Sequence, residues 1–166
     1  MIDDALLRFS DTPQTITTSA YSTNTIDLLA HRDIGAGRQL RAQFYVNATF
    51  AGATSLQILV LAHRTAVVAT DVAALEFAVV GSSEIFALSP INYLTVGKQF
   101  GVTLNDIPQA KLDTFSTGYS TNYAGLRYLT VTYAVDGTFT AGQLTGGLVL
   151  QSSDQKRVYS ASTTMI

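Results

Sequence analysis

The stretch RYLTVTYAV, residues 127–135, decides the fold class because its apolar and polar side chains alternate. The apolar positions are every second residue, namely Leu129, Val131, Tyr133 and Val135. A spacing of two places successive side chains on opposite faces of a β-strand, so one face suits a core and the other a surface. The stretch therefore predicts a half-buried strand.

Similar stretches extend this interpretation along the chain. The same alternation occurs in QLRAQFYVN at 39–47, KQFGVTLN at 98–105 and GQLTGGLVLQ at 142–151. SLQILVL, residues 55–61, is apolar on both faces, which is typical of a central strand. Residues 66–80 contain many β-branched side chains, which favours a pair of strands ending at Gly81 over a helix.

Turn signals separate these segments, and the pair Asp136–Gly137 predicts a tight hairpin because type I′ turns require positive φ. About eight short strands in one domain indicate a sandwich or barrel. We predict an all-β fold, a single-domain antiparallel β-sandwich of jelly-roll type spanning residues 15–151. Residues 1–14 and 152–166 lack a sustained pattern and are predicted to be extended N- and C-terminal arms.

Composition excludes several classes of partner. The chain has 166 residues and a net charge of −2, and its three lysines and seven arginines do not cluster, which argues against nucleic-acid binding. The N-terminus has no signal-peptide pattern, and the apolar runs are too short or too interrupted to span a membrane. Charged residues make up only 13%, so part of the surface is expected to be covered by a partner.

Catalytic and metal-binding patterns were not found in the sequence. There is no cysteine, and His31 and His63 lack neighbours at ligand spacing, so both are interpreted as polar turn residues. Gly35 and Gly37 are not followed by a third glycine or a helical pattern, so they fail as a dinucleotide fingerprint. We therefore predict no enzyme activity, no catalytic residue, no cofactor and no metal.

Several motifs, taken in order, carry a family resemblance. They are MIDD at 1–4, STNTIDL at 22–28, HRDIGAG at 31–37, ATSLQ at 53–57, YAGLRY at 123–128 and TAGQLTGGLVL at 140–150. This set resembles the capsid cement (decoration) proteins of tailed phages of the Bordetella phage type, in which the last motif is a hairpin. Residues 64–97 follow the family pattern poorly, and the loop at 107–122 is longer than the family's.

The resemblance implies a structural virion protein. Such a protein is made in the host cytoplasm and braces adjacent major capsid subunits on the capsid exterior, without catalysis. Its expected partners are the major capsid protein and further copies of itself, as a homodimer or homotrimer. The alternative is a carbohydrate- or host-binding module of a phage tail or cell surface, and a hydrolase on the same scaffold is a third reading. The tyrosines that would stack on sugars are Tyr93, Tyr119, Tyr123 and Tyr128.

Candidate interface residues come from both arms, one turn and one loop. The apolar anchors of the arms are expected to pack on a neighbour, and they are Ile2, Leu6, Leu7, Phe9, Val158 and Tyr159. Arg32 and Arg127 are chosen for pairing with an acidic shell surface, with Asp33 beside Arg32 in the turn. Tyr119 and Tyr123 belong to the long loop and complete the predicted interface.

Overall fold

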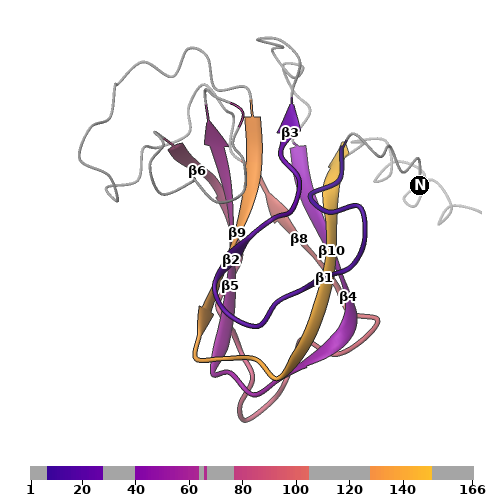
Figure 1. Cartoon of the computed structure of the whole chain (residues 1–166), viewed down its shortest axis with the longest axis vertical. Coiled ribbons are helices and arrows are strands. Elements are labelled where there is room, and N and C mark those ends of the chain that lie inside the picture. The colour runs from indigo at the N-terminus through magenta and orange to yellow at the C-terminus, as the bar shows by residue number, and fades with distance from the viewer. Residues whose placement is uncertain (1–6, 28–39, 64–65, 67–76, 105–127, 151–166) are drawn as a thin grey trace, which may run out of the picture.

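The computed structural model describes residues 7–27, 40–63, 66, 77–104 and 128–150, and this part of the chain is all-β, without an α-helix (Figure 1). The strands are β1 (Gln14–Thr15), β2 (Ala20–Tyr21), β3 (Ile26–Asp27), β4 (Leu40–Ala51), β5 (Ser55–His63), β6 (Phe77–Ser82), β7 (Phe86–Ala87), β8 (Gln99–Thr103), β9 (Tyr128–Asp136) and β10 (Ala141–Leu150). Within the described ranges, no helix is long and apolar enough to span a bilayer.

The strands form two antiparallel sheets. Sheet A has the order β1-β10-β4-β8, and sheet B has the order β2-β9-β5-β6, with β3 also beside β9 and β7 beside β5. One core cluster takes side chains from both sheets, including Phe44 of β4, Ile58 of β5 and Val131 of β9. Two sheets that share one core are the arrangement of a β-sandwich.

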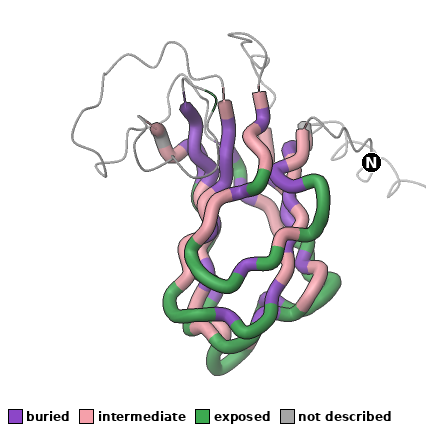
Figure 2. Tube along the Cα trace, in the orientation of Figure 1, coloured by how far each residue is buried: buried purple, intermediate pink, exposed green. Residues whose placement is uncertain are grey.

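The alternation in the sequence corresponds to burial in the structure. Ala42, Phe44 and Val46 of β4 are fully buried, whereas Gln43 and Tyr45 between them are not (Figure 2). In β9 the buried apolar positions are Leu129, Val131 and Tyr133, as the opening stretch predicted. The strands predicted at 39–47, 55–61, 98–105, 127–135 and 142–151 are confirmed as β4, β5, β8, β9 and β10.

The predicted hairpin at Asp136–Gly137 is wrong. Gly137 does have positive φ (95°), but β9 pairs with β5 in sheet B while β10 pairs with β4 in sheet A. The turn therefore carries the chain across the end of the core from one sheet to the other. The motif at 140–150 is likewise one strand, β10, and not a hairpin.

A second crossing lies against the first. Residues 52–54 join β4 of sheet A to β5 of sheet B, and residues 137–140 likewise join β9 of sheet B to β10 of sheet A. Backbone hydrogen bonds connect the two crossings, with Thr54 N donating to Asp136 O at 2.8 Å and Thr140 N donating to Ala51 O at 2.8 Å. β4 pairs with β10 in sheet A, and β5 pairs with β9 in sheet B. The hydrogen bonds between the two crossings thus continue this pairing from one sheet into the other.

Gly81 does not end a strand, contrary to the prediction, because β6 continues through it to Ser82. A Cβ at Gly81 would lie 2.8 Å from Leu104 Cδ2 and 3.0 Å from Thr103 O. The missing side chain lets this edge of sheet B approach the end of β8 in sheet A. Residues 67–76 lie outside the described part, so the first strand of the predicted pair is not tested.

Residues 7–14 pack on the sheets of their own chain. Phe9 N donates to Gly146 O at 2.8 Å, and Arg8 forms an isolated bridge with Gly147 of β10. The Phe9 side chain is fully buried, and its ring stacks on Phe44 with a centroid distance of 6.2 Å. Phe9, which was predicted to pack on a neighbour, is thus packed within its own chain, and its side chain has no exposed surface. The Phe9 ring thus fills the core beside β10, next to β1, which is only two residues long.

Candidate interaction surface

Two of the predicted interface residues, Leu7 and Phe9, lie in the described part of the chain. Leu7 is half-buried and packs against the same core that contains Phe9. The other predicted interface residues lie outside the described part of the chain, and they are Ile2, Leu6, Arg32, Asp33, Tyr119, Tyr123, Arg127, Val158 and Tyr159. Of the predicted set, the described part of the chain contains only Leu7 and Phe9. It shows other surface features that the sequence reasoning missed.

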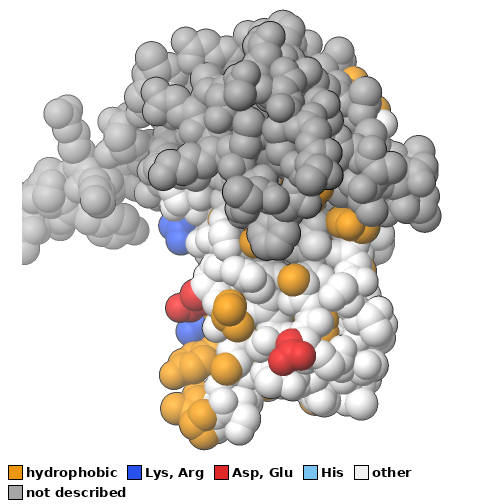
Figure 3. Space-filling model, turned by 90° about the vertical axis from the view of Figure 1, so that its left-hand side faces the viewer, with side chains coloured by type: hydrophobic (Ala, Val, Ile, Leu, Met, Phe, Trp, Pro, Cys, Tyr) orange, Lys and Arg blue, Asp and Glu red, His pale blue; other side chains and the backbone are white. Residues whose placement is uncertain are grey.

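A group of exposed apolar side chains comes from the chain between β6 and β8. Their exposed fractions are 64% for Ile85, 58% for Ile91, 53% for Tyr93 and 62% for Val96. Figure 3 shows hydrophobic side chains gathered toward the lower end of the molecule. We call these four residues the connection patch. Exposed apolar side chains of this size are typical of sites that contact another molecule.

The backbone beneath the connection patch is fixed to β4. Phe50 N donates to Leu94 O at 3.0 Å, Gly97 N donates to Val46 O at 2.9 Å, and Val46 N donates to Lys98 O at 2.9 Å. The Asn92 side chain also donates to Phe50 O at 2.7 Å. The connection therefore continues the pairing of β8 with β4 and presents its exposed side chains from an ordered backbone.

One buried side chain anchors this connection. Leu94 is fully buried in the core cluster, while Tyr93 before it and Thr95 after it are exposed. In the sequence, Ile91, Tyr93 and Leu94 are apolar around a single polar residue, Asn92, so apolar and polar residues do not alternate strictly. The stretch is also too short to stand out, and it directly follows Pro90. Sequence reasoning selected only Tyr93 from this stretch, and for sugar stacking.

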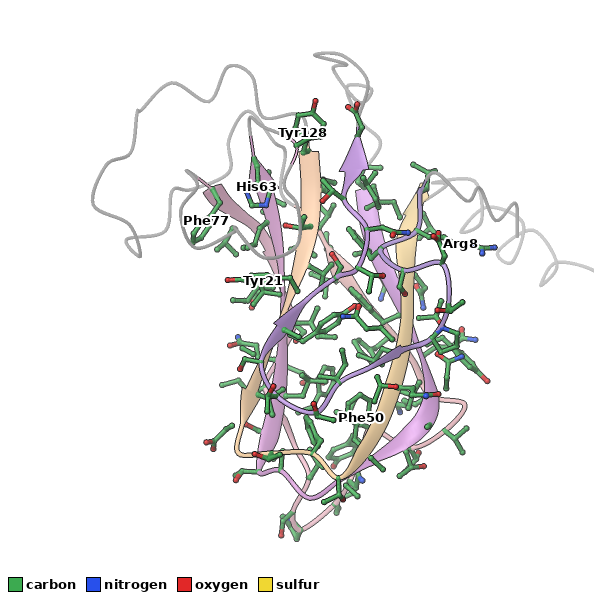
Figure 4. The ribbon with its side chains drawn as sticks, viewed as in Figure 1. Arg8, Tyr21, Phe50, His63, Phe77 and Tyr128 are labelled. Carbon is green, nitrogen blue, oxygen red and sulfur yellow. The ribbon has the colours of Figure 1, made fainter. Side chains whose placement is uncertain are left out.

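The described tyrosines of the predicted sugar platform lie far apart in the fold. Tyr93 lies between two residues that hydrogen-bond to Phe50, and Figure 4 shows Phe50 toward the lower end of the sandwich. Tyr128 begins β9 at the opposite end (Figure 4). Tyr93 and Tyr128 therefore cannot stack on one sugar ring, and Tyr119 and Tyr123 are outside the described residues.

His63 is not a turn residue, contrary to the interpretation from sequence. It is the last residue of β5, it is fully buried, and its Nε2 shares a hydrogen bond of 2.6 Å with Thr130 Oγ1. Its ring lies edge-on to Phe77, with centroids 6.3 Å apart (Figure 4). Nδ1 is buried and has no hydrogen-bond partner among the described residues, and burial lowers the pKa of His63 from 6.5 to about 4.

The lowered pKa of His63 predicts a loss of stability in mild acid. Above pH 6.5 the histidine is neutral in both the folded and the unfolded chain. Between pH 6.5 and pH 4 the unfolded chain binds a proton that the folded chain does not, so stability falls as the pH falls. The full loss is about 3 kcal/mol and levels off below pH 4.

Denaturant unfolding at a series of pH values measures this effect. The control is His63→Asn, which keeps a polar side chain without a titrating ring. Other titrating groups are common to both proteins, so the difference between the two stability curves isolates His63. We expect the wild-type curve to fall more steeply than the variant curve between pH 6.5 and pH 4. Parallel curves would show that His63 does not control acid stability.

No group of three or more His, Asp or Glu side chains that could hold a metal ion occurs within the described ranges. What these ranges present is a two-sheet all-β domain with exposed apolar side chains.

The model of the Bbp16 family matches residues 9–148, which is most of the chain, and the chain belongs to the Bbp16 family. Membership indicates a protein of the Bordetella phage type. A search among curated proteins gave no match.

Proposed function

We propose that this protein is a capsid cement protein that braces adjacent major capsid subunits on the outside of a tailed-phage head. The observation that carries the proposal is membership of the Bbp16 family over residues 9–148. The ordered motifs that resemble phage cement proteins support the same role. The ribbons that bend together from sheet A into sheet B are compatible with the jelly-roll wrapping expected of such a protein.

The connection patch supports a role in protein contact. Interfaces between proteins are enriched in aromatic side chains at their centre and depleted in charge. Ile85, Ile91, Tyr93 and Val96 match that composition, and the hydrogen bonds to β4 hold their backbone in place before any partner binds. A pre-ordered segment loses less conformational entropy on binding than a free loop does. In this proposal the patch contacts the shell or a second copy of the chain.

The proposed action is mechanical and involves no chemical step. A protein that binds the assembled shell, and not free subunits, stabilises the assembled state by mass action. Each bound copy would add the free energy of its contacts to the resistance of the shell against internal pressure. The proposed partners are the major capsid protein and further copies of this chain, in a dimer or trimer.

The test compares DNA-filled heads with and without this protein. On heating, undecorated heads are expected to release DNA at a lower temperature than decorated heads, and adding back the purified protein should restore the higher temperature. A variant carrying Ile91→Ser and Tyr93→Ser should bind heads at least about tenfold more weakly. Thr95→Ala, an exposed change in the same segment, is the control. Equal release temperatures with and without the protein would contradict the cement role.

A further inference from the structure

The outer face of sheet A carries an arginine whose side chain lies close to a glycine of the neighbouring strand. Ala42 and Phe44 of β4 point into the core, so Arg41 lies on the opposite, outer face of the sheet. Its side chain crosses the neighbouring strand β8 at Gly101. A Cβ on Gly101 would collide with Arg41 Nε and would lie 2.6 Å from Cζ. The missing side chain of Gly101 therefore provides the space that the Arg41 guanidinium occupies beside β8.

The Arg41 guanidinium lacks an acceptor within the described residues. Its Nε is buried and makes no hydrogen bond, and Arg41 forms no ion pair there. A buried donor without an acceptor is unfavourable by roughly 1–3 kcal/mol. A guanidinium presents its donors in a planar fork that matches a carboxylate. The arrangement is thus suited to an acceptor that comes from another molecule.

The charge of sheet A favours an acidic partner. β1, β4, β8 and β10 contain no Asp or Glu. Lys98, directly before β8, is exposed and adds a second positive charge next to this edge. The acidic residues in the described ranges lie on β3, at the end of β9 or in connecting segments, and they are Asp11, Asp27, Glu84 and Asp136. The outer face of sheet A therefore presents positive charge without a neutralising carboxylate on its own strands.

We propose that the outer face of sheet A, at Arg41 and Gly101, docks an acidic protein surface, with a partner Asp or Glu carboxylate accepting hydrogen bonds from the Arg41 guanidinium. This inference rests on the proposed function, in which the partner is the phage shell. A second copy using the same face is disfavoured by charge. In a twofold contact the same surface meets itself, so Arg41 would face Arg41 with no carboxylate on either sheet A.

The test measures binding of purified protein to undecorated shells at increasing salt concentration. Arg41→Gln is expected to bind on the order of tenfold to a hundredfold more weakly than wild type, with a shallower salt dependence. Arg41→Lys keeps the charge but loses the planar fork, so its binding should be intermediate. Asp136→Asn removes a charge at the exposed end of β9 in sheet B and should bind shells as wild type does. Thermal unfolding of each variant checks that it folds as wild type does, so that a loss of shell binding is not a loss of folded protein.

The outcomes separate this inference from the proposed function. If wild-type protein does not bind shells, the cement role and the acidic docking face are both overturned. If wild type binds and Arg41→Gln binds equally well, the docking face is wrong and the cement role stands. If Arg41→Gln changes self-association in sedimentation but leaves shell binding unchanged, the face contacts a second copy. That result would also overturn the inference.

Discussion

Replacing Phe44 with alanine is expected to lower the free energy of unfolding by about 3–5 kcal/mol, the cost of removing a large aromatic side chain from a packed core. Phe44 is fully buried, and its ring stacks between Phe9 at 6.2 Å and Phe100 at 5.5 Å between centroids. It therefore joins the N-terminal segment, β4 and β8. A cavity at this position would remove the contacts of all three, and equilibrium unfolding in urea measures the loss.

Tyr45→Ala is the matched control for Phe44→Ala. Tyr45 is the next residue of β4, but it lies on the outer face and is exposed. Surface substitutions of this kind change stability by about 0.5 kcal/mol or somewhat more for an aromatic side chain. Equal losses for the two variants would contradict the assignment of Phe44 as the link between the N-terminal segment and both strands.

Gly142→Ala is expected to destabilise the fold by about 3 kcal/mol, from two effects that add. The backbone at Gly142 has φ +150°, which a residue with a Cβ adopts at a cost of roughly 1–2 kcal/mol. The new Cβ would also collide with the ring of Phe50. That ring cannot move freely because it packs edge-on against Phe139, with centroids 4.9 Å apart. Overpacking of this kind adds about 1–3 kcal/mol.

Gly97→Ala separates the two effects. Gly97 also has positive φ (86°), but a Cβ there would meet no atom within 4 Å. We therefore expect a loss of only about 1 kcal/mol, from the backbone alone. Thermal and urea unfolding of both variants, measured side by side, gives the difference. If Gly97→Ala is as destabilising as Gly142→Ala, contact with Phe50 is not the main cause.

The long strands were predictable because alternation over many residues records which face meets the core. β4 and β9 are long enough for the period of two to be unmistakable, and β5 showed its central position by being apolar on both faces. Strands of two residues, such as β1 and β7, contain no period at all. They exist because a neighbouring long strand offers hydrogen bonds to the passing chain, and this depends on tertiary structure.

Sheet membership and the candidate surface were harder to predict. A turn sequence such as Asp136–Gly137 specifies local backbone angles, and these do not tell whether the next strand pairs with the last one or crosses to the other sheet. His63 resembled a polar turn residue because its hydrogen-bond partner, Thr130, is 67 positions away in the chain. Arg41 showed no signal in sequence, since its position depends on a glycine in another strand.

The two crossings at residues 52–54 and 137–140 give the sandwich one stiff end. At that end only a few covalently linked residues separate sheet A from sheet B in each ribbon, so the sheets cannot part there without stretching the backbone itself. Tyr93 of the connection patch lies at the same end, because its neighbours Asn92 and Leu94 bond to Phe50, two residues before the first crossing. A pulling force applied at this end would therefore act on both sheets at once. The two sheets would move together under that force as one unit.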